Sequence, residues 1–167
     1  MKFIKKIVLA GLGLVLIFIM YLLVNTFNFK STQVHYEPVP VFKIDRASIE
    51  NFSQAIKIKT VSPENAIDFD SLQFRNFETF LVKTYPLVDS LLEKKTFNSF
   101  SYLYKWPGSD PSLKPIILMA HLDVVPVIEA NIPDWKHPPF GGEIINDTIW
   151  GRGTIDDKVG VIGIMES

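Results

Sequence analysis

An imidazole and a carboxylate stand two positions apart in the tripeptide His121-Leu122-Asp123, directly after an apolar run. In an extended chain, side chains at positions i and i+2 point to the same side, so His121 and Asp123 can face one site. A zinc-bound imidazole commonly has its second nitrogen held by a carboxylate, which fixes the tautomer and raises the basicity of the ligand. The spacing is compatible with a metal site, although the tripeptide alone fits an ordinary surface or turn role better.

Two adjacent carboxylates, Asp156 and Asp157, follow the glycines Gly151 and Gly153 and precede an apolar segment that begins at Lys158. The glycines permit a tight backbone path before the carboxylates. Aspartates at the start of a helix ordinarily cap it and interact favourably with its dipole. Taken alone, the pair predicts helix capping rather than chemistry.

The two clusters occur in order within longer strings, and the strings together are more specific than either cluster. The chain reads LMAHLDVVPV over residues 118–127 and IWGRGTIDDK over 149–158, separated by the loop PDWKHPPFGG at 133–142. This combination resembles the zinc peptidase family that contains carboxypeptidase S, acetylornithine deacetylase, succinyl-diaminopimelate desuccinylase and carnosinase. Segments 108–115 and 135–141 are most similar to its carboxypeptidase S and N-fatty-acyl-amino-acid synthase/hydrolase branch. The resemblance covers roughly residues 44–167.

The resemblance implies a role for each side chain of the two clusters. His121 matches a histidine ligand of one zinc ion, Asp123 a catalytic aspartate that supports this histidine, and Asp156 a carboxylate that bridges two zinc ions. A carboxylate suits the bridging position because its two oxygens can each bind one ion at the ~3.5–4 Å spacing of two-metal sites. Asp157 has no ligand role in the family pattern, and we expect it to cap the helix or to support the ligands.

Other parts of the family pattern are expected to lie beyond this sequence. The general-base glutamate, further ligands and a smaller dimerisation domain all follow the helix that begins at Lys158, and Glu166 comes too early to be the base. Zinc usually has about four ligands, which two residues cannot supply. We therefore interpret residues 45–167 as an incomplete N-terminal portion of a catalytic domain. The resemblance implies hydrolysis of an amide bond in a small peptide or N-acyl amino acid by two zinc ions, and dimerisation through a domain not present here.

Two other interpretations remain open. The missing ligands favour, for the chain as it stands, a non-catalytic, membrane-tethered binding or interaction domain. A mononuclear site that joins His121 to His35 or His137 has no spacing to recommend it, and we expect both of these other histidines to be solvated. Arg152 and Lys158 are expected to be structural.

Residues 7–24, IVLAGLGLVLIFIMYLLV, carry no charge and approach the roughly 20 apolar residues that span a bilayer core. Three lysines precede this segment, and only Lys30 closely follows it. The positive-inside rule then places residues 1–6 in the cytoplasm and the body on the extracytoplasmic side. A cleaved signal peptide is the alternative, but its apolar region is usually about 7–15 residues and ends in small residues, which Val24-Asn25-Thr26-Phe27 lacks. The segment is predicted to be a single transmembrane signal-anchor.

Residues 25–44 are predicted to be an extended linker, because Pro38 and Pro40 alternate with valines. Beyond it we expect a helix capped by Asp45, a helical region over 70–94 interrupted at Pro86, strands over 99–106 and 115–120, a hairpin over 143–150, and a helix from 158. The run PIILMA at 115–120 suits a strand buried on both faces. This order predicts an α/β fold, the N-terminal part of a mixed-sheet, co-catalytic zinc exopeptidase-like domain preceded by a transmembrane helix.

Charge and composition exclude some classes of partner and site. The formal net charge is -1, and the first thirty residues hold four lysines and no acid, which leaves about -5 for the rest. The body therefore has no basic field, and we expect no nucleic-acid partner. The chain has no cysteine, which excludes disulfides and thiolate zinc sites, so any metal must be held by His, Asp or Glu.

Overall fold

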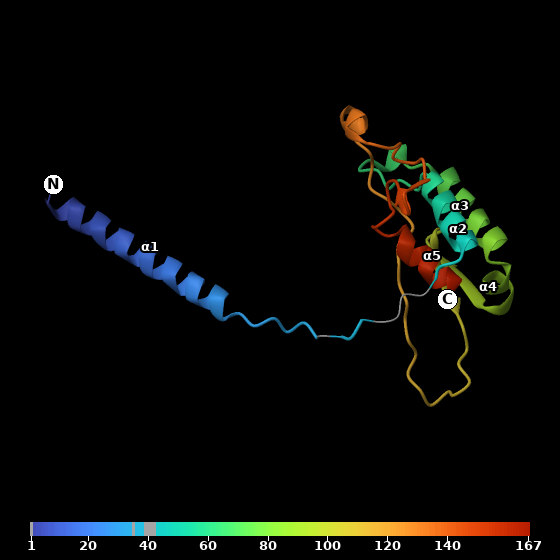
Figure 1. Ribbon diagram of the computed structural model, residues 1–167, viewed down its shortest axis with the longest axis horizontal. Helices are drawn as coiled ribbons and strands as arrows, with labels where there is room; N and C mark the ends of the chain where they lie inside the picture. The colour runs from blue at the N-terminus through green and yellow to red at the C-terminus, as the bar shows by residue number, and fades with distance from the viewer. Residues whose placement is uncertain (1, 35, 39–42) are drawn as a thin grey trace. The chain divides into compact units, whose positions relative to one another are not determined.

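The computed structural model describes residues 2–34, 36–38 and 43–167, which fall into two units, residues 1–42 and 43–167. The first unit contains helix α1 (Lys2–Asn28), which has no buried residue and has a mean hydropathy of 3.0 in its most apolar window (Figure 1). By length and composition alone, α1 can cross a membrane. It includes the predicted segment 7–24 and extends into the expected linker. His35 and residues 39–42 of that linker lie outside the described residues.

The second unit contains four helices, α2 (Arg46–Lys57), α3 (Ser71–Thr84), α4 (Pro86–Leu91) and α5 (Lys158–Glu166), and two 3-10 turns, Ala66–Asp68 and Glu129–Asp134. Asp45 caps α2 as predicted, because its Oδ1 accepts from Ser48 N at 2.9 Å. Asp70 caps α3 in the same way, with Leu72 N at 3.0 Å. Helix α3 ends at Thr84 and α4 begins at Pro86, which confirms the predicted interruption.

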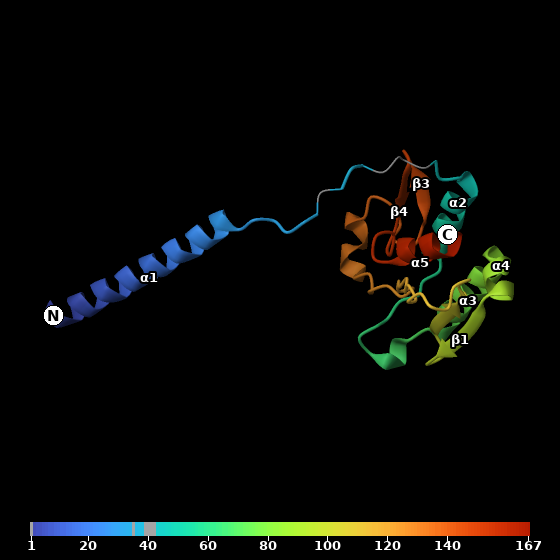
Figure 2. The same ribbon diagram turned by 90° about the horizontal axis from the view of Figure 1, so that it is seen from below.

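The core of this unit lies where α2, α3 and α5 meet (Figures 1 and 2). Apolar residues spaced three or four apart give each helix one buried face. The buried cluster consists of Ala55, Phe77, Leu81, Tyr85 and Ile162. Burial of these side chains fixes the end of α2 against the start of α5, and the candidate site is built on that junction.

Two antiparallel hairpins complete the described structure: β1 (Glu93–Phe97) with β2 (Ser101–Lys105), and β3 (Glu143–Ile145) with β4 (Thr148–Trp150). The second hairpin confirms the prediction, and its turn residues Asn146 and Asp147 have φ of 49° and 58°, as a two-residue hairpin turn requires. The predicted helix over 70–94 is wrong at its end, because residues 93–97 form β1. Pairing with β2 overrides the helical pattern there, and Lys94 is held by Glu78 Oε1 at 2.7 Å.

The predicted buried strand at 115–120 is wrong. These residues form part of a long loop that projects from the helices in Figure 1, and the side chains of Ile116, Ile117, Leu118 and Met119 are 64–87% exposed. An apolar run becomes a buried strand only beside partner strands, and the described residues place none beside it. The α/β composition agrees with the prediction. The single mixed sheet does not, since the described strands form two separate two-stranded sheets plus one parallel bridge between Val61 and Val124.

Candidate metal site

His121 is the centre of a small cluster of carboxylates. Its Nε2 lies 2.9 Å from Asp156 Oδ1, and its Nδ1 lies 3.2 Å from Asp123 Oδ1 and 3.0 Å from Asp123 O. The structure thus brings together the three side chains that the sequence singled out. One ring nitrogen faces the carboxylate of Asp123, and the other faces Asp156, which is the orientation that second-sphere carboxylates give to a metal-binding imidazole.

Loops, and not strand ends, create this convergence. Residues 121–123 follow the exposed loop at 116–119 and are held by the parallel bridge at Val124. Asp156 lies in the turn between β4 and α5, where Gly151 has φ of 156° and Gly153 has φ of 90°. An added Cβ at Gly153 would lie 2.6 Å from the side chain of Val124. Glycine therefore lets the two loops approach each other closely enough for Asp156 to reach His121.

The cluster is open to solvent and electronegative. The side chains of His121, Asp123 and Asp156 are 51%, 43% and 82% exposed. Burial alone would lower the pKa of His121, but the hydrogen bond with Asp156 and the contacts with Asp123 outweigh it and raise the pKa above its usual value. Two carboxylates beside one imidazole thus favour positive charge, whether a proton or a metal ion supplies it.

Asp157 supports His121 and does not cap α5. It occupies the N-cap position without a side-chain capping bond, and its Oδ2 instead accepts from His121 N at 3.3 Å. The capping prediction is wrong, whereas the alternative, support of the ligands, agrees with this contact. Gly160 makes it feasible, because an added Cβ there would lie 2.5 Å from Asp157 Oδ1 and 3.0 Å from the Cβ of Ala120.

The donor set fits part of a zinc site. Two ligand atoms that each lie about 2.0–2.2 Å from zinc at a tetrahedral angle are ~3.4 Å apart. His121 Nε2 and Asp156 Oδ1 are 2.9 Å apart, and Asp156 is exposed enough to rotate by the small amount needed. The part of the chain that the structure describes holds no group of three or more His, Asp or Glu side chains able to bind a metal ion. The residues present therefore fit as two ligands of a larger set.

Lys158 has the structural role expected of it. Its side chain is fully buried, and its Nζ donates to Ala55 O at 2.9 Å and to Ile58 O at 2.6 Å, at the C-terminal end of α2. Burial lowers the pKa of its ammonium group to about 7. Arg152 is also structural, since its guanidinium lies 5.4 Å from the ring centre of Trp135. Both residues brace the turn that carries Asp156.

The expectation of a solvated His137 is wrong. Its Nδ1 lies 2.7 Å from Glu143 Oε2, and its ring lies 4.6 Å from that of Trp150, so it joins the loop to the hairpin. Glu166 is likewise occupied, because Tyr85 Oη, Ser48 Oγ and Asn51 Nδ2 donate to its carboxylate at 2.8, 2.9 and 3.2 Å. Both side chains tie elements together.

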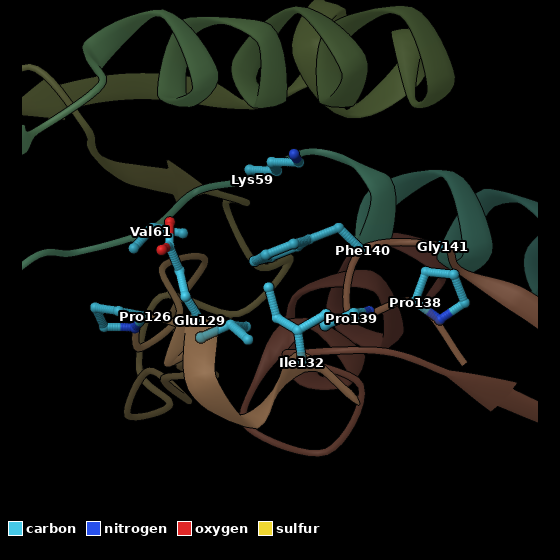
Figure 3. Close-up of a pocket in the computed structure, with 10 residues that line it drawn as sticks. Lys59, Val61, Pro126, Glu129, Ile132, Pro138, Pro139, Phe140 and Gly141 are labelled. Carbon is cyan, nitrogen blue, oxygen red and sulfur yellow. The ribbon is translucent and has the colours of Figure 1, made fainter. Parts of the chain in front are cut away.

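A separate hollow of about 520 Å³ lies beside the cluster and contains none of its proposed ligands (Figure 3). Phe140 lies within it, with Lys59 Nζ 5.6 Å from its ring centre. Val61 lines the hollow, whereas its neighbour Ser62 turns to Asp123. Adjacent side chains of an extended segment point to opposite sides, so the hollow and the carboxylate cluster occupy opposite sides of residues 61–62.

Comparison with known proteins agrees with the resemblance seen in the sequence. Residues 117–167 match peptidase family M20/M25/M40. The chain is 38% identical to probable carboxypeptidase S-like 2 of Dictyostelium discoideum over 89% of its own length and 30% of that protein. It is 41% identical to carboxypeptidase S of Saccharomyces cerevisiae, over 71% of the chain and 22% of that protein. It is 40% identical to an N-fatty-acyl-amino acid synthase/hydrolase of Xenopus tropicalis, over 71% and 23%.

The chain thus spans less than a third of the length of these relatives. The family match includes both clusters, His121 with Asp123 and Asp156 with Asp157. The chain is similar to peptidase family M20/M25/M40 over residues 117–167, and to proteins named carboxypeptidase S and N-fatty-acyl-amino acid synthase/hydrolase over most of its own length.

Proposed function

We propose that this chain supplies the N-terminal part of a membrane-anchored, zinc-dependent amidohydrolase that cleaves an amide bond of a small peptide or an N-acyl amino acid. The observation that carries the proposal is the position of His121 Nε2, 2.9 Å from Asp156 Oδ1, while Nδ1 faces Asp123. The relatives named as carboxypeptidases and acyl-amino acid hydrolases support the same class of reaction.

In this proposal His121 and Asp156 would hold zinc, and Asp156 would be the carboxylate that the family resemblance assigns to both ions. Bound zinc would polarise the scissile carbonyl and make a water molecule acidic enough to attack it. Asp123 holds the imidazole through Nδ1, so that Nε2 keeps its lone pair for the metal. Asp157 fixes the backbone of His121 from the other side. The proton-transferring base and the remaining ligands would come from a part of the protein beyond residue 167.

The membrane part of the proposal rests on α1. A helix of 27 residues with this hydropathy is long and apolar enough to cross a bilayer, and in this proposal the lysines at its start favour a cytoplasmic N-terminus. We expect the protein to remain in the membrane pellet after alkaline extraction. Release into the supernatant would contradict the anchor but not the chemistry.

Hydrolysis of dipeptides and of N-acyl amino acids by the full-length protein that contains this chain tests the reaction. We expect activity that a chelator abolishes and zinc restores, with losses of at least 100-fold in kcat for His121→Ala and Asp156→Ala. Asp147→Asn is the matched control, because this exposed turn carboxylate has positive φ, which asparagine tolerates. Wild-type activity in Asp156→Ala would refute the proposal.

A second function, a tethered domain without catalysis, is favoured by one observation. The described residues contain no group of three potential ligands. If the full-length protein bound no zinc and cleaved none of these substrates, this second function would replace the first.

A further inference from the structure

The segment Thr60-Val61-Ser62 lies alongside residues 122–124 and is the structural partner of the His-x-Asp tripeptide. Val61 and Val124 form a parallel bridge, in which Val124 N donates to Thr60 O at 2.8 Å and Ser62 N donates to Val124 O at 3.0 Å. Thr60 Oγ1 also donates to Leu122 O at 2.5 Å. These contacts join two segments that are about sixty residues apart, and they fix the backbone beneath His121 and Asp123.

The side chain of Ser62 makes a hydrogen bond that is separate from the backbone bridge between the two segments. Its Oγ donates to Asp123 Oδ2 at 2.7 Å, while the other oxygen, Oδ1, lies 3.2 Å from His121 Nδ1. Each carboxylate oxygen of Asp123 therefore has its own partner. The hydrogen bond to Oδ2 restrains rotation of the carboxylate and keeps Oδ1 beside Nδ1, whose own hydrogen-bond partner is Asp123 O at 3.0 Å.

We propose that Ser62 is a positioning residue for the metal-binding imidazole. It acts through Asp123 on His121, so that Nε2 points to Asp156 before metal binds. The inference rests on the proposed function, since it assumes that His121 is a zinc ligand. The structure separates this role from folding: Thr60 is fully buried and ties the segments together, whereas Ser62 is exposed and its hydroxyl reaches only the cluster.

The magnitude follows from the position of Ser62 in the chain of contacts. Loss of a residue that directly holds a metal ligand typically costs about 10–100-fold in metal affinity. Ser62 is one contact further out, so we expect zinc affinity to fall by about 3–10-fold in Ser62→Ala. Ser62→Thr keeps the hydroxyl and should restore most of the affinity.

The test is zinc affinity of the full-length protein, measured by competition with a chelator, beside Tm, kcat and KM. For Ser62→Ala we expect weaker zinc binding and lower kcat at saturating zinc, with unchanged Tm and little change in KM. In the Asp123→Asn background the same substitution should add nothing, because the two residues act in series. Ser112→Ala is the matched control, since Ser112 Oγ donates to Asp110 Oδ1 at the same 2.7 Å in an exposed loop.

Wild-type zinc affinity in Ser62→Ala would overturn the inference, as would a loss of Tm as large as that of Thr60→Ala. Variants of His121 and Asp123 separate this inference from the proposed function. If they bind zinc like the wild type, the proposed function fails. If they lose zinc while Ser62→Ala does not, only the positioning role fails.

Discussion

Because Lys158 is buried, we expect the free energy of unfolding of the chain to depend on pH in the alkaline range. Its ammonium group is buried beneath the turn that carries Asp156, and its two acceptors are the carbonyls of Ala55 and Ile58. Burial lowers the pKa of Lys158 from 10.5 to about 7. Between pH 7 and 10.5 the unfolded chain therefore binds more protons at this site than the folded chain, so stability rises with pH in that window.

The size of the rise follows from the shift. A change from 10.5 to about 7 corresponds to roughly 5 kcal/mol at 1.36 kcal/mol per pKa unit. The two carbonyl acceptors and the C-terminal dipole of α2 stabilise the ammonium, which opposes the effect of burial. We therefore expect the free energy of unfolding to rise by about 2–4 kcal/mol between pH 7 and 10.

Urea unfolding of the detergent-solubilised chain at several pH values measures this rise, with Lys158→Met as the variant. The variant should lose the slope, and it should also lose the two hydrogen bonds from Lys158 Nζ, at a cost of about 0.5–1.5 kcal/mol for each, because the carbonyls of Ala55 and Ile58 keep the backbone donors Ile58 N and Thr60 N. Lys57→Met, at an exposed position in the last turn of α2, is the control and should keep the wild-type slope. A flat wild-type profile, or an equal slope in Lys158→Met, would refute the reasoning.

Two further predictions concern α5. Gly160→Ala should weaken zinc binding by several-fold, because the added Cβ would displace the Asp157 carboxylate from His121 N. Gly163→Ala, whose added Cβ meets no atom within 4 Å, should only stabilise the helix, by about 0.5–1 kcal/mol. Chelator competition and urea unfolding measure both effects, and equal zinc affinity in the two variants would contradict the contact between Asp157 and His121. Burial tends to raise the pKa of Glu166, but hydrogen bonds from Tyr85, Asn51 and Ser48 outweigh it and lower the pKa below 4.5. The Glu166 contribution to stability is therefore present above pH 4.5 and is lost as the pH falls through the lowered pKa. Glu166→Gln should destabilise the chain by about 0.5–1 kcal/mol at pH 7, which is less than for a buried carboxylate because Glu166 is exposed. In acid the variant should lose no further stability through this site. Acid unfolding curves monitored by circular dichroism test this, and a shift of the same size at pH 3 would count against it.

Local patterns in the sequence predicted the helices well, because their signals are contained in a few neighbouring residues. Asp45 caps α2, Pro86 restarts the chain at α4, and Asn146 with Asp147 turns the hairpin, as each residue type favours. The pattern failed where distant pairing decides the structure. Residues 93–97 pair with β2, and the apolar run at 115–120 lacks a partner strand among the described residues.

The sequence indicated which side chains form the candidate site, but not the contacts of Ser62 and Asp157 that hold them in place. The family resemblance of the longer strings singled out His121, Asp123 and Asp156, since neither cluster alone indicates a metal site, and the structure brings the three side chains together. The contact of Ser62 with Asp123 spans 61 positions, and no local pattern in the sequence indicates it. Likewise, the adjacent pair at 156–157 gave no sign that one carboxylate faces the imidazole and the other the backbone of His121.

The most direct test of the account is the number of zinc ions that the full-length protein retains after equilibrium dialysis. The account predicts two per chain in the wild type, one in His121→Ala and none in Asp156→Ala, because Asp156 is proposed to bridge both ions. Asp147→Asn should keep two. Retention of two zinc ions by Asp156→Ala would contradict the central claim that this carboxylate and His121 share a metal ion.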